Sequence, residues 1–102
     1  MLKKWFLKPL EKTEVERKTD ELLLRFAFME TLVDYNQKID FLTSFRELLR
    51  TYIKELKNFY SSESGNMPLH GRLAFQHGID SNEATLKWCK KAITQLTQIK
   101  QS

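Results

Sequence analysis

The spacing of apolar positions predicts two long helices in the second half of the chain. From Pro68 to Ile99, apolar or small residues recur at alternating steps of four and three, at Phe75, Ile79, Asn82, Leu86, Cys89, Ile93 and Leu96. A second series lies upstream, at Leu42, Phe45, Leu49, Tyr52, Leu56 and Phe59. Such steps place side chains along one helix face, as in the seam of a coiled coil. We call these series the downstream seam and the upstream seam.

Polar and turn-forming residues set the expected ends of these two helices. Asn36 is a suitable N-cap, and the helix that it begins is expected to reach about Tyr60. The polar segment 61–66 then predicts a loop. Pro68 fits the first position of the last helix, because proline lacks the amide that a first turn leaves unbonded. A loop this short makes the two helices an antiparallel pair.

The first third of the chain predicts two further helices. Residues 1–8 form a short amphipathic piece, which Pro9 ends because proline disfavours helix in the residue before it. Thr13 and Glu16 have the spacing of a capping box. The helix that they begin is expected to run to about Val33, with apolar residues on most sides of its second half.

These elements predict an all-α fold with one domain over residues 1–102: a short N-terminal helix and three longer ones, the last two a long antiparallel pair. A chain of 102 residues buries a small share of its surface. The two seams offer more apolar surface than one such protomer covers easily, so we expect a helical homodimer. The predicted interface comprises Leu42, Leu49, Leu56, Phe75, Ile79, Asn82, Leu86, Ile93 and Leu96.

Asn82 is the strongly polar position of the downstream seam, and two interpretations of it stay open. A buried asparagine at a seam position can fix the register and the number of partners, at a cost in stability. Alternatively, the helix rotates slightly, and Asn82 reaches water or bonds a neighbouring side chain.

Charge and composition narrow the class of protein. The net charge is +4, without a block of five or six like charges. That charge exerts a weak pull toward nucleic acid, and a solvated helix face explains it equally well. No stretch approaches the roughly 20 apolar residues of a membrane span. The basic start lacks the features of a signal peptide, and the single Cys89 cannot form an intrachain disulfide, so a cytoplasmic protein is expected.

The sequence offers little for catalysis or for a cofactor. His70 and His77 have no further histidine or cysteine at metal-ligand spacing, so no metal site is predicted. Cys89 lies on the downstream seam, where cysteine behaves as a small hydrophobe, and no base is placed to activate it. We therefore expect neither an enzyme nor a bound cofactor.

Several aromatic side chains allow a different role. Trp88, Phe75, Phe26 and Trp5 are candidates to line a pocket for a flat aromatic ligand. Aromatic residues at helical spacing are also typical of an ordinary core, and the sequence does not separate the two interpretations.

Three segments, taken in order, resemble a known family. They are the stretch Trp5 to Leu10, the stretch Asp20 to Phe26, and Gly78-Ile79 followed by Ala84, Leu86-Lys87-Trp88 and Ala92-Ile93. This set is similar to the C-terminal helical domain of PadR-type transcriptional regulators, in the branch that includes the virulence-gene activators. The resemblance extends over almost the whole chain.

The resemblance implies a role in gene regulation. Family members bind DNA through an N-terminal winged helix-turn-helix, their following helices dimerise, and some sense phenolic or flat aromatic compounds. This chain begins where that C-terminal domain begins, so it is expected to contact DNA only through a winged helix-turn-helix that it does not contain. We expect a dimerisation and regulatory domain; the alternatives are a sensor of small aromatic effectors and a helical protein that binds nucleic acid without sequence specificity.

Overall fold

The computed structural model describes residues 10–17, 19–30 and 33–101, and all their side chains except those of residues 17 and 101. Within this part of the chain the regular structure is entirely helical. It consists of α2 (Lys12–Arg17), α3 (Thr19–Ala27), α4 (Tyr35–Glu63), the short 3-10 helix η1 (Ser64–Asn66) and α5 (Leu69–Gln101). The all-α fold is therefore confirmed. The predicted helix over residues 1–8 lies outside the described residues.

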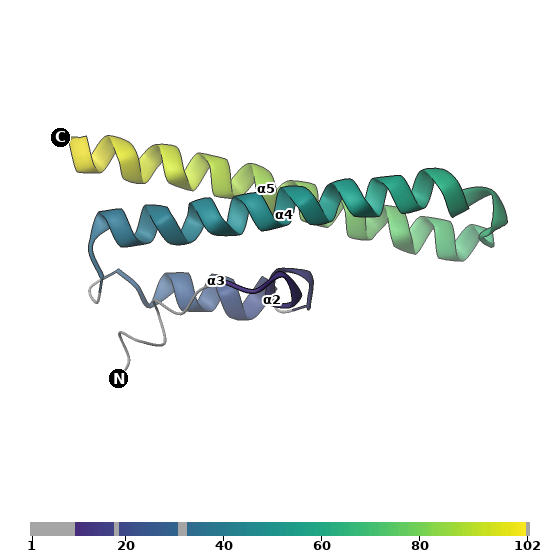
Figure 1. The fold of residues 1–102 in the computed structure, drawn as a ribbon, viewed down its shortest axis with the longest axis horizontal. Helices are drawn as coiled ribbons and strands as arrows, with labels where there is room; N and C mark the ends of the chain where they lie inside the picture. The colour runs from purple at the N-terminus through teal and green to yellow at the C-terminus, as the bar shows by residue number, and fades with distance from the viewer. Residues whose placement is uncertain (1–9, 18, 31–32, 102) are drawn as a thin grey trace.

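Helices α4 and α5 form the long antiparallel pair that the two seams predict (Figure 1). The 33 residues of α5 make a rod about 50 Å long at ~1.5 Å per residue, which equals the longest dimension of the molecule, 50 Å. Figure 1 shows α2 and α3 along only one part of α4. The radius of gyration is 15.8 Å, against about 13 Å for a compact chain of this length. The turn end of the hairpin thus projects beyond the other helices.

The turn between α4 and α5 is tighter than expected. Helix α4 continues to Glu63 and η1 follows at once, so the predicted loop over 61–66 is wrong. Met67 is extended, with φ −90° and ψ 138°, because a following proline disfavours the helical conformation. The Pro68 carbonyl accepts the Arg72 amide at 3.0 Å, so Pro68 caps α5 and the helix begins one residue later than predicted.

The helix predicted from Thr13 to about Val33 is also different. The region contains two helices, α2 and α3, and helical structure ends at Ala27. The chain then turns: the Met29 amide bonds the Phe26 carbonyl at 3.0 Å, three residues back instead of four. This tighter turn lets the Met29 side chain enter the core with no exposed surface. Burial of the side chain thus prevails over local helical periodicity.

The caps of the early helices lie two residues before the predicted ones. In α2, the Glu11 amide donates to the Glu14 carboxylate at 3.1 Å, and Thr13 lies inside the helix. In α4, Asp34 is the N-cap: its carboxylate accepts the Gln37 amide at 2.8 Å, and its own amide donates to the Gln37 side chain at 3.0 Å. This is a complete capping box, so the assignment of Asn36 as the cap is wrong.

The core lies between α4 and the three other helices. Its fully buried side chains are Val15, Leu22, Met29, Leu42, Phe45, Leu49 and Cys89. Leu86, Ile93 and Leu96 of the downstream seam pack against this cluster. The two seams therefore close largely on each other within one chain.

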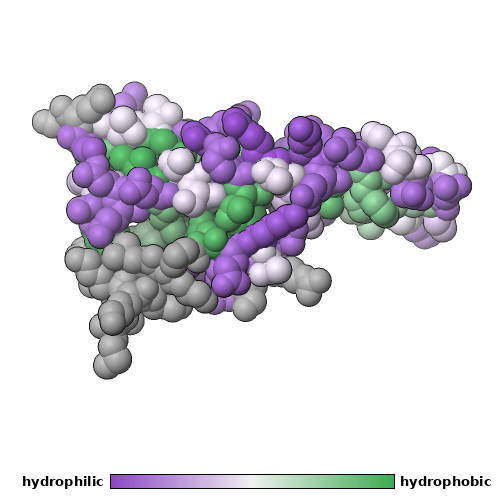
Figure 2. Space-filling view, in the orientation of Figure 1, coloured by the Kyte–Doolittle hydropathy of each residue, from purple (hydrophilic) through white to green (hydrophobic). Residues whose placement is uncertain are grey.

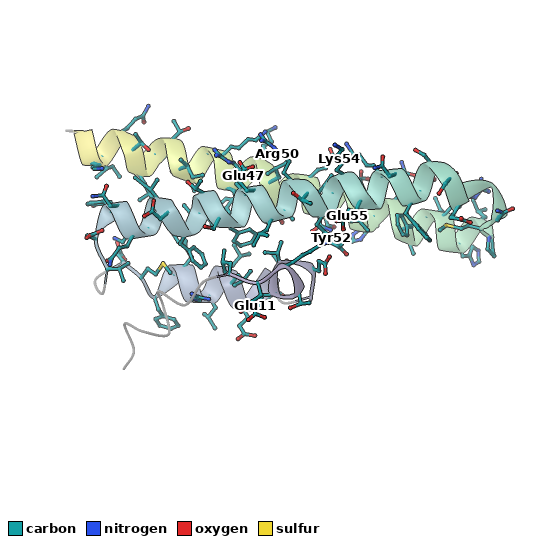
Figure 3. All side chains as sticks on the ribbon, viewed as in Figure 1. Glu11, Glu47, Arg50, Tyr52, Lys54 and Glu55 are labelled. Carbon is teal, nitrogen blue, oxygen red and sulfur yellow. The ribbon has the colours of Figure 1, made fainter. Side chains whose placement is uncertain are left out.

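Among the described residues, two ion pairs join different helices at the surface. The Lys12 ammonium lies 2.7 Å from the Glu55 carboxylate, linking α2 to α4, and Lys57 lies 2.9 Å from Glu83, linking α4 to α5. Figure 3 shows Glu55 among the charged side chains of α4. Because all four side chains are about half exposed, each pair contributes ~0–1 kcal/mol to stability. The buried apolar contacts therefore dominate the packing.

The position of the α4 cap can be tested by mutation. Asp34→Ala removes the acceptor for the Gln37 amide and is expected to lower the free energy of unfolding by about 1 kcal/mol. The measurement is urea denaturation followed by circular dichroism. Asn36→Ala is the matched control, with an expected loss under ~0.5 kcal/mol because Asn36 lies on the exposed surface inside the helix and, among the described residues, its side chain bonds only the exposed Lys100 ammonium. A larger loss for Asn36→Ala than for Asp34→Ala would contradict this assignment.

Candidate interaction surface and grooves

The residues of the predicted dimer interface divide into two groups by burial. Leu42, Leu49 and Ile79 are buried by their own chain and have almost no surface left for a second copy. Half-buried residues form the other group: Leu56, Phe75, Asn82, Leu86, Ile93 and Leu96. The same chain thus already covers the centre of both seams, and the interface that they predict stays a prediction.

Asn82 uses its amide within its own helix. Its Nδ2 donates to the Gly78 carbonyl at 2.7 Å, one turn back along α5. The side chain is half-buried. This hydrogen bond lets a polar group sit at a seam position of the single chain.

Large apolar side chains are exposed elsewhere, and one group of them lies at the turn end of the hairpin. Phe59 of α4 is 51% exposed, and Leu69 and Leu73 of α5 are each 57% exposed. Phe75 of α5 stacks on two rings of α4, with its ring centroid 5.5 Å from that of Phe59 and 5.7 Å from that of Tyr60. Figure 2 shows apolar surface at this end, among polar residues. We call Phe59, Leu69 and Leu73 the tip patch.

A groove runs between α3 and α5. It has a volume of about 550 Å³ and is lined by Leu23, Phe26, Ala27, Ala84, Thr85 and Trp88. The Trp88 and Phe26 rings meet edge to face, with centroids 5.7 Å apart and planes at 83°. Because Trp88 is 36% exposed, a ligand in the groove would reach its ring. We call this the Trp88 groove.

The Trp88 groove contains only part of the aromatic pocket predicted from the sequence. Phe26 and Trp88 do come together. Phe75 lies thirteen residues from Trp88 along the same helix, about 20 Å away at ~1.5 Å per residue. It belongs to the stacked rings beside the tip patch, so its assignment to this pocket is wrong. Trp5 lies outside the described residues.

Two buried cations were not singled out by the sequence reasoning. Arg25 of α3 is 2% exposed, and its guanidinium carbon lies 5.1 Å from the centre of the Phe41 ring, a cation–π contact. Burial lowers the pKa of Arg25. Lys38 of α4 is 7% exposed and lies one turn before Leu42 of the upstream seam. Lys38 extends the upstream seam by one turn toward the N-terminus, and this spacing in the sequence could have indicated that it is buried.

Lys38 lines a second cavity, beside the Trp88 groove. This cavity has a volume of about 360 Å³ and is lined by Phe26, Ala27, Glu30, Tyr35, Lys38, Leu96 and Ile99. It lies where the start of α4, the turn after α3 and the last turns of α5 meet. We call it the Lys38 cavity.

The described residues contain no group of three or more side chains arranged to hold a metal ion. Glu47 and Arg50 of α4, both labelled in Figure 3, form an exposed ion pair. In the described part of the chain, none of the helices combines the length and apolar character that crossing a bilayer requires.

Cys89 of α5 is wholly buried in the core. Burial raises the pKa of its thiol from 9.0 to about 11, because the thiolate is poorly solvated there, while the charge of Arg46 partly opposes the shift. A neutral thiol packs as a small apolar group, as the seam position predicts.

Comparison with known proteins places the domain. Residues 19–97, from the start of α3 to four residues before the end of α5, match the family of the virulence activator alpha C-terminal domain. The chain belongs to this family. No curated protein and no solved structure matches it significantly. The family match covers the helices that form both the Trp88 groove and the Lys38 cavity.

The buried thiol of this virulence activator domain predicts a pH dependence of stability. Its pKa in the folded state, about 11, lies above the unfolded value near 9, so the folded state holds the proton more tightly. This contribution is complete below pH 9 and is lost as the pH rises toward 11, at up to ~1.4 kcal/mol per pH unit. Urea denaturation across this range measures it.

Cys89→Ala is the control for that experiment, because it removes the thiol and leaves every other ionisable side chain in place. The free energy of unfolding of the native chain is expected to fall more steeply with pH than that of the variant. Parallel profiles would show that Cys89 is not protected from ionisation.

Proposed function

We propose that this chain is a dimerisation and regulatory domain of a PadR-like transcriptional regulator, acting in the cytoplasm and without catalytic activity. Its membership of the virulence activator alpha C-terminal family supports a regulatory role. The three segments that resemble PadR-type regulators support the narrower assignment. Two copies of the helical domain would set the distance between the DNA-binding units attached to them.

The observation that carries the proposal is the uncovered end of the hairpin. The α4–α5 pair extends beyond α2 and α3, and the tip patch exposes more than half of each of its three large apolar side chains. Large apolar side chains left exposed at an end that the other helices do not cover favour contact with a partner. A second copy would bury it and relieve the small core of a 102-residue chain.

The packing within the chain changes which residues we propose for that interface. Leu42, Leu49 and Ile79 are already covered, so they would support the hairpin from inside. The partner would contact the outer surface, with the tip patch at its centre and half-buried seam residues such as Leu56 at its edge. The buried seam residues would then contribute to the interface indirectly, because they fix the packing of α4 against α5.

Regulation would follow from the geometry of the pair. DNA-binding units on two copies meet two half-sites about one turn of DNA apart, so a change in the packing of the copies alters binding. An effector would act only if it bound one arrangement more tightly than the other.

The oligomeric state tests the proposal. Size-exclusion chromatography with light scattering is expected to give the mass of a dimer at micromolar concentration. Leu73→Asp would bury an unpaired carboxylate in the interface and is expected to weaken the dimer by ~100-fold or more. The exposed position of Leu73 makes the variant compatible with a folded protomer.

Gln95→Asp is the matched control, because it introduces the same charge at an exposed position of α5 far from the tip patch. It is expected to leave the dimer intact, with the helical circular dichroism of both variants unchanged. A folded native monomer would contradict the proposal, and a dimer that Leu73→Asp leaves intact would contradict the assignment of the tip patch.

The Trp88 groove favours a second candidate function, the sensing of flat aromatic compounds. It places an indole ring that is 36% exposed in an apolar channel of about 550 Å³, within the usual range of ~300–1,000 Å³ for ligand pockets.

A planar probe tests this second function. In a Trp5→Phe variant, Trp88 is the single tryptophan, and 2-naphthoate is expected to quench its fluorescence with saturation. Ala84→Phe, which fills the groove from an exposed position, is expected to weaken quenching by at least ~10-fold. Quenching that rises without saturation, equally in both proteins, would indicate random collisions and contradict a site.

A further inference from the structure

Lys38 is a buried cation whose contacts are few. Its ammonium donates one hydrogen bond, to the Glu30 carbonyl at 2.8 Å, and lies 4.6 Å from the centre of the Tyr35 ring. An ammonium has three donors. The residue is 7% exposed, and no described protein group accepts a hydrogen bond from the remaining two.

No described carboxylate neutralises this charge. The ion pairs of the described residues leave Lys38 out, and the Glu30 carboxylate is no closer than 4.0 Å to its ammonium although the Glu30 carbonyl bonds it. Burying a charge is unfavourable unless an opposite charge or several hydrogen bonds compensate it. The site therefore favours an anion from outside the chain.

The Lys38 cavity gives such an anion a place. Its volume of about 360 Å³ is near the small end of the ~300–1,000 Å³ of ligand pockets. Its walls away from the ammonium come from Ala27, Leu96 and Ile99, which are aliphatic. A ligand that matched both parts would combine one negative group with a short apolar body.

The rings around the cavity favour an aliphatic body over a flat aromatic one. Phe26 already stacks on Phe41, with centroids 6.2 Å apart and planes at 10°, and meets the edge of Trp88. Tyr35 presents its ring to the Lys38 ammonium. A planar ligand would find both rings engaged, whereas an alkyl chain needs only the aliphatic wall of Leu96 and Ile99.

We propose that the Lys38 cavity binds a small aliphatic carboxylate, with its carboxylate on the Lys38 ammonium and its chain along Leu96 and Ile99. This inference goes beyond the proposed dimerisation, since it concerns a site formed within one protomer. The ligand would join the end of α5 to the start of α4. The Lys100 ammonium, which bonds the Asn36 side chain at the same end, adds to the positive potential there.

Titration calorimetry on the full chain tests the proposal, with octanoate as the probe and octanol as its uncharged counterpart. Octanoate is expected to bind with one site per chain and at least ~10-fold more tightly than octanol, because only the carboxylate meets the Lys38 charge. It is also expected to bind more tightly than 2-naphthoate. Equal affinities for octanoate and octanol would overturn the proposal. So would a 2-naphthoate that binds more tightly than octanoate and displaces it.

Lys38→Met keeps the length of the side chain and removes its charge. It is expected to lower the affinity for octanoate at least ~10-fold and to leave the affinity for octanol unchanged. Lys54→Met is the matched control, since Lys54 is exposed on the same helix and lies outside the cavity (Figure 3). Octanoate binding that Lys38→Met leaves unchanged would show that the lysine serves only to hold the Glu30 carbonyl.

A second variant applies if Lys38→Met fails to fold. Ile99 is 53% exposed, so Ile99→Asp is compatible with the fold and places a negative charge at the cavity wall. It is expected to abolish octanoate binding, and retained binding would overturn the proposal. Because the readout is ligand affinity per chain, it is separate from the dimer mass measured with Leu73→Asp.

Discussion

The burial of one face of α4 is the constraint on which the rest of the structure depends. Leu42, Phe45 and Leu49 lose all of their exposed surface, and each of the other helices packs on the cluster that they form. Helix α5 covers this face along its length, while α2 and α3 cover one part of it (Figure 1). Dispersion and the hydrophobic effect have no preferred direction, so the same face accepts helices from two sides. What remains at the turn end is a pair of helices with no third layer.

That unequal cover explains where apolar surface stays exposed. Leu42, Phe45 and Leu49 of the covered half enter the core, whereas Phe59, Leu69 and Leu73 near the turn stay more than half exposed. Trp88 and Ile99 of the covered half also keep exposed surface, at the groove and the cavity that they line. The half-buried Phe75 ring of α5 stacks on Phe59 and Tyr60 of α4. An interface at this end would continue the packing that begins in the core. The hairpin lies within the part of the chain that matches the virulence activator alpha C-terminal domain family.

Two cationic side chains, Arg25 and Lys38, are buried inside the bundle among apolar residues. Arg25 and Lys38 approach from α3 and α4, and both lie beside aromatic rings that can accept a cation at their faces. A purely structural role would be better served by apolar residues, since burying a charge carries a desolvation cost. Only Lys38 of the two lines the Lys38 cavity, where a buried charge would interact more strongly with a ligand of opposite sign than it would in water.

The sequence by itself determined the helical class, the two long helices and the seam positions that close the hairpin, because amphipathic spacing is a local property that survives any arrangement. It also indicated the family, through segments that fall mostly on α3 and α5. Tertiary structure alone decided that Leu42 and Leu49 face their own chain, that Phe26 meets Trp88 while Phe75 lies far away, and that Lys38 is buried. The caps at Glu11 and Asp34, two residues before the predicted ones, likewise appear only in the structure. These features depend on contacts between segments distant in sequence, whose distances no local pattern contains.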